Sequence, residues 1–171
     1  MMAEKAKEGN VHVQIHDEVL RDQDGREVRF KRDILDDRVV VMDFVYTTCT
    51  TVCPVLTALM KKLQDRLGER LGKDVFLVSV TVDPVHDTPS KLKAYASRHG
   101  AKAGWIWLTG EKHRVDKVLK GLGAYSADYT QHPAMVLVGD AGSGEWKRFY
   151  GFPSIDQIEK AVEALLAKRG Q

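Results

Sequence analysis

The sequence predicts an α/β domain, and three observations support this prediction. Residues 39–45 and 75–82 are almost continuously apolar and rich in β-branched side chains, which is typical of strands covered on both faces. Apolar residues recur at helical spacing after each of these segments. The length of 171 residues suits one domain with a core large enough to need no disulfide staples.

The composition is ordinary for a soluble protein. The chain is 43% hydrophobic and 29% charged, and its 26 basic and 24 acidic residues give a formal net charge of +2. Stretches such as residues 61–70 mix both signs, so the sequence contains no basic patch that would follow a phosphate backbone. We therefore expect no nucleic acid partner.

The N-terminal segment contains no targeting signal. Residues 1–10 are polar and are predicted to be flexible, and residues 11–171 are predicted to form a single domain. No apolar run approaches the roughly 18 residues of a membrane span. We expect either a cytosolic protein or one whose leader or anchor has been removed, and the doubled Met1-Met2 fits an engineered start.

The first half of the domain predicts a hairpin, a strand and a helix. Alternating apolar residues around a turn-prone stretch at 22–25 predict the hairpin; they are Val11, Val13, Ile15, Val28 and Phe30. The strand at residues 39–45 should be central. The helix after it has an apolar stripe formed by Leu56, Leu59, Met60, Leu63 and Leu67.

The second half continues the alternation. After the strand at 75–82, Thr88 and Pro89 are typical of an N-cap and first turn, and the glycines at 121 and 123 should help to end a helix that includes residues 115–122. Trp105 and Trp107 flank Ile106 in a short alternating segment, where ordinary packing is favoured over exposure of one indole at a partner face.

The chain closes with a hairpin and a helix. Residues 134–138 and 146–150 read as two strands joined by a glycine-rich turn, and Ser154 with Gln157 forms a capping box before the last amphipathic helix. This order of elements matches the thioredoxin arrangement with an N-terminal β-hairpin added.

The two cysteines of the chain lie in one short window. Cys49 and Cys53 stand between the strand at 39–45 and the following helix, so both sulfurs should lie near a helix N-terminus, a position that lowers the pKa of a thiol. Thiolates are the form that attacks disulfides and binds metals, and a pair of soft sulfurs favours Cu(I). Copper is therefore a candidate ligand.

Three other interpretations of the cysteine pair stay open. A structural disulfide would close a loop so short that it adds little stability. Redox enzymes of the thioredoxin type have two residues between the cysteines, whereas this chain has three. Thiol peroxidases carry Pro and Thr at set positions ahead of the reactive cysteine, and Met42 and Tyr46 occupy those positions here.

A histidine distant in sequence is the candidate third ligand. His132 precedes the strand at 134–138, and in a thioredoxin-like sheet that loop faces the start of the cysteine helix, although a single histidine is more often a surface or core residue. The other five histidines, His12, His16, His86, His99 and His113, are expected to be surface residues. The His132–Pro133 peptide bond is expected to be cis, as is common in the corresponding loop of thioredoxin-like proteins.

Three elements in order resemble the SCO/SenC family: residues 43–49 with Cys53-Pro54, residues 82–89, and His132. The resemblance extends from about Val19 to Pro153. It implies a thioredoxin-like fold that binds copper through Cys49, Cys53 and His132. It also implies a role in maturing the dinuclear copper centre of cytochrome c oxidase. Many members have Pro after the first cysteine and a small hydroxyl residue after the histidine, where this chain has Thr50 and Pro133.

The same resemblance implies that Asp83 supports the ligands, although a carboxylate at a strand end equally often caps a turn. The main hypothesis is a copper metallochaperone; the alternative is a thiol-disulfide oxidoreductase acting on an oxidase subunit, in which Cys49 attacks and Cys53 resolves. Expected partners are the copper-bearing oxidase subunit or another copper chaperone. The expected location is extracytoplasmic, with membrane contact only through a missing N-terminal anchor.

Overall fold

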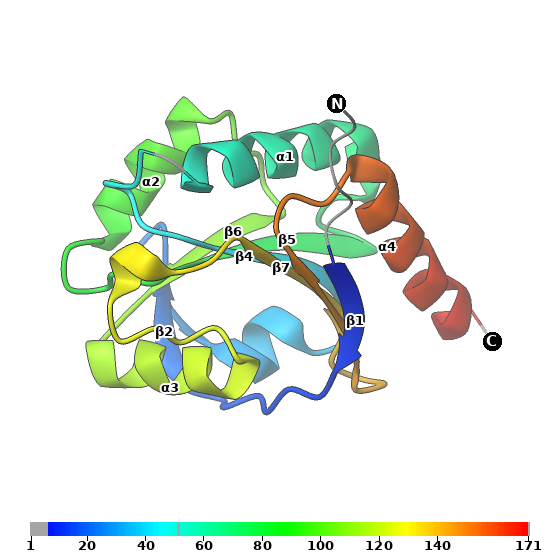
Figure 1. Cartoon of the computed structure of the whole chain (residues 1–171), viewed down its shortest axis with the longest axis horizontal. Coiled ribbons are helices and arrows are strands. Elements are labelled where there is room, and N and C mark those ends of the chain that lie inside the picture. The colour runs from blue at the N-terminus through cyan, green and yellow to red at the C-terminus, as the bar shows by residue number, and fades with distance from the viewer. Residues whose placement is uncertain (1–6, 51, 171) are drawn as a thin grey trace.

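The computed structural model describes residues 7–50 and 52–170. In this part of the chain one sheet is covered by helices on both faces (Figure 1). Its strands follow the order β1-β8-β7-β4-β5-β6-β2-β3. Their bounds are β1 Lys7–Val11, β2 Val19–Asp22, β3 Glu27–Arg29, β4 Val39–Val45, β5 Val75–Thr81, β6 Trp105–Thr109, β7 Met135–Asp140 and β8 Glu145–Tyr150.

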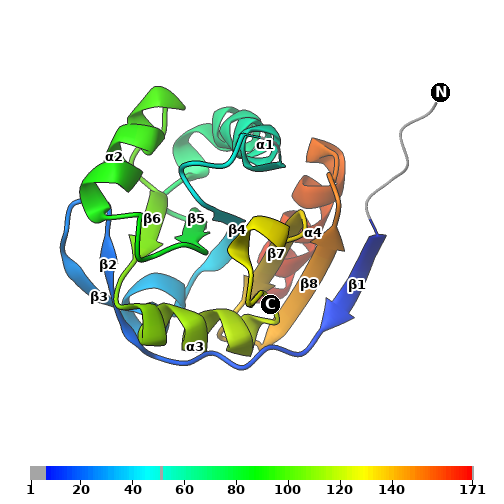
Figure 2. The same cartoon turned by 60° about the vertical axis from the view of Figure 1, so that its left-hand side comes forward.

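The helices are α1 (Val52–Leu67), α2 (Pro89–Arg98), α3 (Lys112–Leu122) and α4 (Ile155–Arg169). Figure 2 shows α1, α2 and α4 on one face of the sheet and α3 on the other. β4 runs parallel to β5 and antiparallel to β7, and β7 forms a hairpin with β8. The thioredoxin-like α/β fold predicted from the sequence is therefore confirmed.

The central strand β4 divides the core into two layers. Val39, Val41 and Val45 pack with α1, α2 and α4, whereas Val40 and Met42 pack with α3 and a π-helical turn at Phe30–Leu35. Every residue of β4 is buried. This explains why all residues of the strand except Asp43 are apolar, since neither of its faces meets water.

The N-terminal hairpin forms, but with a different first strand. β2 and β3 pair around the predicted turn, where Gly25 adopts a φ of 80°, and β2 extends the sheet beyond β6. Val13 and Ile15 lie outside the strands and pack against the layer that contains α3. The prediction was wrong here because alternation reports which side chains are buried, and it does not identify the partner strand.

The segment expected to be flexible contributes an edge strand. Lys7–Val11 form β1, which pairs antiparallel with β8 from Lys7 opposite Tyr150 to Val11 opposite Trp146. Residues 7–10 of that segment thus belong to a strand, because a distant strand supplies hydrogen-bond partners that local sequence does not reveal. The remainder of the segment, residues 1–6, lies outside the described part of the chain.

The predicted helix ends are confirmed except at Gly121, which lies within α3 and does not end it. The Thr88 hydroxyl accepts the Lys91 N–H, Ser154 and Gln157 form a reciprocal capping box, and Gly123 ends α3 with a φ of 71°. These caps satisfy N–H and C=O groups that a helix end leaves without partners. Among the described residues, no helix combines the length and apolar character needed to cross a bilayer.

The sheet brings three loops to one edge. Parallel strands end at a common edge, so the loops after β4 and β5 lie together there, and antiparallel β7 begins at the same edge. Cys49 follows β4, Asp83 follows β5, and His132 precedes β7. The fold thus places side chains from three distant stretches of sequence within one region.

Candidate metal centre

Cys49, Cys53 and His132 line one small pocket of about 30 Å³. The other residues that line it are Phe44, Tyr46, Val82, Thr130 and Pro133. The cysteines come from the start of α1 and the loop before it, and the histidine comes from the loop before β7. The structure thus brings together the three side chains singled out in the sequence.

Both cysteines are reduced and nearly buried, with exposed fractions of 7% for Cys49 and 5% for Cys53. Cys53 lies in the first turn of α1, and its N–H points at the Cys49 sulfur over a distance of 3.4 Å. The N–H of Cys49 in turn donates to the carbonyl of Tyr46 at 3.0 Å. Cys49 is therefore the sulfur toward which the helix N-terminus directs a donor.

The thiol of Cys53 departs from the expected electrostatics. Burial raises the pKa of the Cys53 thiol above its ordinary value, and the hydrogen bond with Cys49 raises it further. The expectation that the helix N-terminus lowers the pKa of both thiols is therefore wrong for Cys53. Burial disfavours the charged sulfur more strongly than the helix end favours it.

Two tyrosines near the cysteine loop, Tyr46 and Tyr129, were not singled out as site residues in the sequence. Burial and a hydrogen bond to Cys49 raise the pKa of Tyr46 to about 12. The Tyr129 ring meets the Tyr46 ring edge-on, with centroids 5.2 Å apart, and the charge of Asp83 raises the pKa of Tyr129. No motif marks Tyr129, because its role depends on how two loops meet.

His132 is held on one side of its ring. Nε2 donates to the carbonyl oxygen of Ala124 at 2.8 Å, and the imidazole packs against Phe44 with ring centroids 5.5 Å apart. Burial lowers the pKa of His132, so the imidazole is neutral at physiological pH, the form in which histidine binds metals. The His132–Pro133 bond is trans, and the expectation of a cis bond is wrong; trans is the lower-energy isomer for X-Pro as well.

The three side chains share a pocket without forming a ready-made coordination sphere. Within residues 7–50 and 52–170, no group of three His, Cys, Asp or Glu side chains stands close enough to hold a metal ion. The donor chemistry nevertheless suits a soft metal, because two sulfurs and one neutral imidazole nitrogen are ligands that Cu(I) accepts. Binding of one ion by all three side chains would therefore require a rearrangement of the pocket.

Asp83 lies beside the pocket and does not line it. The residue is 4% exposed, and its carboxylate accepts from Nδ1 of His86 at 2.9 Å. Its main-chain oxygen accepts the N–H of Asp87 in a tight turn. His86 is mostly exposed, as expected, but it has a partner that the sequence did not reveal.

Asp87 fixes the loop that leads to the cysteines. Its carboxylate accepts the N–H and the hydroxyl of Thr47, at 3.1 and 2.5 Å, and the hydroxyl of Thr81 at 2.7 Å. The Thr109 hydroxyl donates to the Asp87 carbonyl at 2.7 Å. A single buried acid thus ties together the ends of β4, β5 and β6.

Asp43 is a fully buried carboxyl group in the middle of β4. Burial raises its pKa to about 7, Ser79 donates to one oxygen, and the other oxygen has no hydrogen-bond partner among the residues that the structure describes. Trp105 Nε1 donates to the same Ser79 hydroxyl at 3.0 Å. Trp105 and Trp107 are both buried, which confirms the packing interpretation of these indoles.

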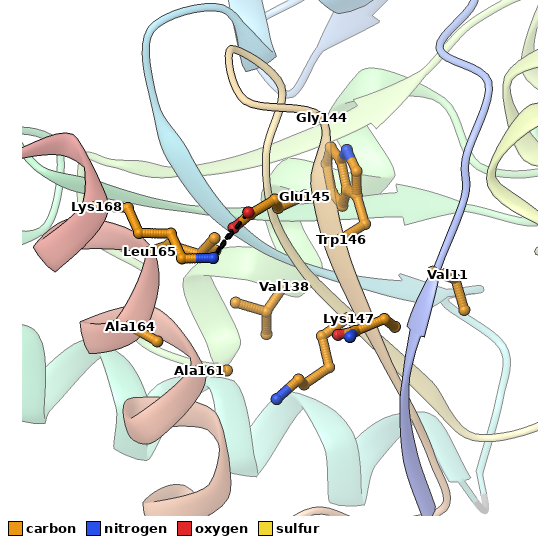
Figure 3. A pocket seen from close by; sticks show the side chains of 11 residues that line it. Val11, Val138, Gly144, Glu145, Trp146, Lys147, Ala161, Ala164, Leu165 and Lys168 are labelled. Atoms are coloured by element: carbon orange, nitrogen blue, oxygen red, sulfur yellow. Dashed lines mark hydrogen bonds and ion pairs between the residues drawn. The ribbon is translucent and has the colours of Figure 1, made fainter.

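A larger cavity of about 340 Å³ lies at the other end of β7 and β8, where these strands join in a turn (Figure 3). The cavity lies between α4 and the β1–β8 edge. On its wall Lys168 points toward Glu145, with Nζ 2.8 Å from the carboxylate. Neither Cys nor His lines it. The lining of this cavity is partly apolar and partly charged. The cysteine and histidine side chains lie at the opposite edge of the sheet.

The fold and the pocket define a class of protein: a thioredoxin-like protein with a reduced cysteine pair at the start of α1 and a histidine facing it. The family model described as SCO1/SenC matches residues 15–166. The chain therefore belongs to the SCO1/SenC family.

Individual relatives agree with this assignment. A protein of Stutzerimonas stutzeri whose name describes it as copper-binding is 33% identical over 94 residues, which cover 55% of this chain and 45% of that protein. The chain spans about half the length of the curated relatives it matches. A SCO1/SenC family lipoprotein from Bacillus anthracis has a TM-score of 0.75 and 28% identity, over 92% of this chain and 97% of that one.

BsSco, a member of the Sco family of cytochrome c oxidase assembly proteins in which a disulfide switch was identified, has a TM-score of 0.71 and 25% identity. The match covers 94% of this chain and 96% of that one. Further Sco structures solved with copper bound, at 21% and 22% identity, share the fold.

Proposed function

We propose that this protein is a copper metallochaperone that binds one copper ion through Cys49, Cys53 and His132. Its cargo is destined for the dinuclear copper centre of cytochrome c oxidase. The observation that carries the proposal is that these three side chains, from two distant parts of the sequence, line one pocket. Membership in a family whose relatives are named for copper binding and oxidase assembly supports it.

The site chemistry suits a carrier that must also release its cargo. Both sulfurs are nearly buried, which limits competition from water, while His132 comes from a separate loop. Nε2 of His132 already donates to Ala124, so Nδ1 is the nitrogen left for a metal, and such a bond to the other ring nitrogen is usual in metal-binding histidines. A partner thiolate that displaces one ligand at a time would then take the ion.

The test is anaerobic titration of the reduced protein with Cu(I) against a chromophoric chelator. We expect one copper ion per chain, and an affinity at least about tenfold lower for His132→Ala, since even outer partners of a ligand affect affinity 10- to 100-fold. Cys49→Ala and Cys53→Ala should retain no copper at chelator concentrations that the unchanged protein withstands. His113→Ala is the matched control, because this histidine is exposed and outside the pocket.

Two results would contradict the ligand set. One is an unchanged Cu(I) affinity in Cys53→Ala or His132→Ala. The other is an equal loss of affinity in His113→Ala and His132→Ala, which would assign the effect to general destabilisation.

Thiol-disulfide exchange is the second candidate, and the reduced state of the adjacent cysteines favours it. Cys49 would attack a disulfide of an oxidase subunit, and Cys53 would attack the mixed disulfide to release the reduced product. This function predicts that metal-free protein reduces a protein disulfide rapidly and that Cys49→Ser abolishes the reaction. Both functions can use one site, because oxidation of the pair removes the thiolates that a metal needs.

The proposed partners are the copper-bearing oxidase subunit or another copper chaperone, and the proposed location is extracytoplasmic. The lipoprotein from Bacillus anthracis supports an anchored protein that faces outward. Fractionation of cells that produce the complete natural protein, with an outward-facing protease to test accessibility, would check this location.

A further inference from the structure

An apolar groove lies beside the start of α1, outside the metal pocket. It has a volume of about 460 Å³ and runs between α1 and the segment that joins β8 to α4, which lie side by side in both views (Figure 1, Figure 2). Its lining, as far as the described residues go, is apolar apart from Lys62. The apolar lining consists of Pro54, Val55, Ala58, Leu59, Phe152 and Pro153.

Two large apolar side chains of the groove are half exposed to water, Val55 at 52% and Phe152 at 49%. Apolar side chains gathered on a surface in this way mark a place where another molecule binds. Pro54 and Pro153 stand on the two walls, and each proline ring fixes its own backbone φ. The groove is therefore largely formed before anything binds, which lowers the entropic cost of binding.

Both walls of the groove adjoin a segment that carries a candidate ligand. Pro54 directly follows Cys53 in the first turn of α1. On the other wall, the N–H of Gly151 donates at 3.0 Å to the carbonyl oxygen of Ala134, which lies between His132 and β7. Because the two sulfurs are nearly buried, a partner that exchanges anything with them must first be held at the surface close by.

Lys62 gives the groove a positive charge at the end remote from the cysteines. Among the described residues, no carboxylate forms an ion pair with its ammonium group. The neighbouring bases Lys61 and Arg66, by contrast, each pair with a carboxylate of this chain. A cation without a partner beside an apolar surface is complementary to an acidic side chain that follows apolar residues.

The length of the groove sets the length of the segment that fits it. From Pro54 to Lys62 the axis of α1 advances by about 12 Å, since each helical residue rises about 1.5 Å. An extended chain covers that distance in about four residues.

We propose that this groove docks the protein that receives copper from the site or exchanges a disulfide with it, through an extended segment of about four apolar residues that ends in an acid. The acid pairs with Lys62, and the apolar residues cover Val55 and Phe152. The other end of the segment then lies at the first turn of α1, beside Cys53. That the occupant is an exchange partner rests on the proposed function, whereas binding of such a segment does not depend on copper.

The test uses the reduced protein and two blocked synthetic peptides as probes. Each peptide has about four apolar residues, followed by Glu in one peptide and by Lys in the other. In an NMR titration the Glu peptide should bind with a Kd below about 1 mM and shift the amide signals of Ala58, Leu59 and Phe152. The Lys peptide should bind about fivefold more weakly, because an exposed ion pair contributes modestly.

Three variants test the two kinds of contact. Lys62→Glu should weaken the Glu peptide about fivefold and strengthen the Lys peptide by a similar factor. Phe152→Ala should weaken both peptides about tenfold, as is usual when an aromatic anchor is removed. Val85→Ala is the matched control, because Val85 is 65% exposed and lies outside the groove, and it should bind both peptides like the unchanged protein. Thermal unfolding verifies that each variant is folded.

Three results would overturn the proposal: a Kd of the Glu peptide above about 1 mM, an unchanged preference in Lys62→Glu, or an equal loss in Val85→Ala and Phe152→Ala. Phosphatidylcholine vesicles that bind in place of the peptides, in a manner that Phe152→Ala abolishes, would assign the groove to a membrane surface. Self-association of the chain with the same dependence on Phe152 would assign it to a second copy. Either assignment would equally overturn the docking of a partner segment.

Cu(I) titration of the same variants separates this proposal from the proposed function. Lys62→Glu and Phe152→Ala should bind Cu(I) as tightly as the unchanged protein, since neither residue lines the metal pocket. A protein that binds the Glu peptide but no Cu(I) refutes the copper function and retains the docking groove. Normal Cu(I) binding without peptide binding does the reverse.

Discussion

Asp43 illustrates how burial changes an ionisable side chain in this protein. It lies on the central strand with no exposed surface, and the Ser79 hydroxyl donates to it. A charged carboxylate in such surroundings is costly, so the folded protein favours its protonated form and raises its pKa to about 7. The other residues of β4 are apolar because both faces of the strand are buried, and Asp43 lies in the same environment.

Replacing Asp43 should change how stability depends on pH. In the folded state its pKa lies above the ordinary value, so the protonated group stabilises the fold below about pH 4, and this contribution is lost as pH rises to about 7. Asp43→Asn should therefore gain stability relative to the unchanged protein across this interval. The upper limit is on the order of 4 kcal/mol, since each pKa unit corresponds to about 1.4 kcal/mol.

Urea unfolding of both proteins at several pH values measures this difference. Curves of unfolding free energy against pH that remain parallel between pH 4 and 7 would show that Asp43 titrates alike in the folded and unfolded chain.

At this scale the sequence identified the ligand candidates but not their surroundings. Cys49, Cys53 and His132 stand out because their residue types and order resemble a family motif. The Tyr129 contact with Tyr46 and the Ser79 contact with Asp43 depend on strand register and loop packing. Register and packing are properties of the folded chain, which residue patterns alone do not specify.

The helix caps represent the elements best predicted from sequence. Ser154 and Gln157 satisfy each other's backbone N–H groups at the start of α4, with distances of 3.1 and 2.9 Å. Such signals are local: the residues that cap the helix are those that begin it. The N-terminal region shows the opposite case, since β1 pairs with β8 at the far end of the chain.

Ser154→Ala should lower the free energy of unfolding by about 1 kcal/mol, because one helix N–H loses its acceptor. The urea midpoint at constant slope measures the loss. Ser97→Ala, on the exposed face of α2, is the control and should change the midpoint little. Equal midpoints for the two variants would mean that the box adds nothing to stability.

For the whole molecule, topology explains how a site forms from distant residues. The loops after β4 and β5 and the loop before β7 meet because these strands share an edge. The order of elements was sufficient to predict this convergence. It was not sufficient to predict that His132 bonds to Ala124, or that no three His, Cys, Asp or Glu side chains in the described part of the chain stand close enough to hold a metal ion.

The central claim is that two sulfurs and one remote imidazole bind the same copper ion. X-ray absorption spectroscopy of the Cu(I)-loaded protein, compared with loaded His132→Ala, measures this directly. We predict a first coordination sphere of two sulfurs and one nitrogen, with the imidazole signal absent in the variant. Identical spectra for the two proteins would contradict the account, because they would place His132 outside the coordination sphere.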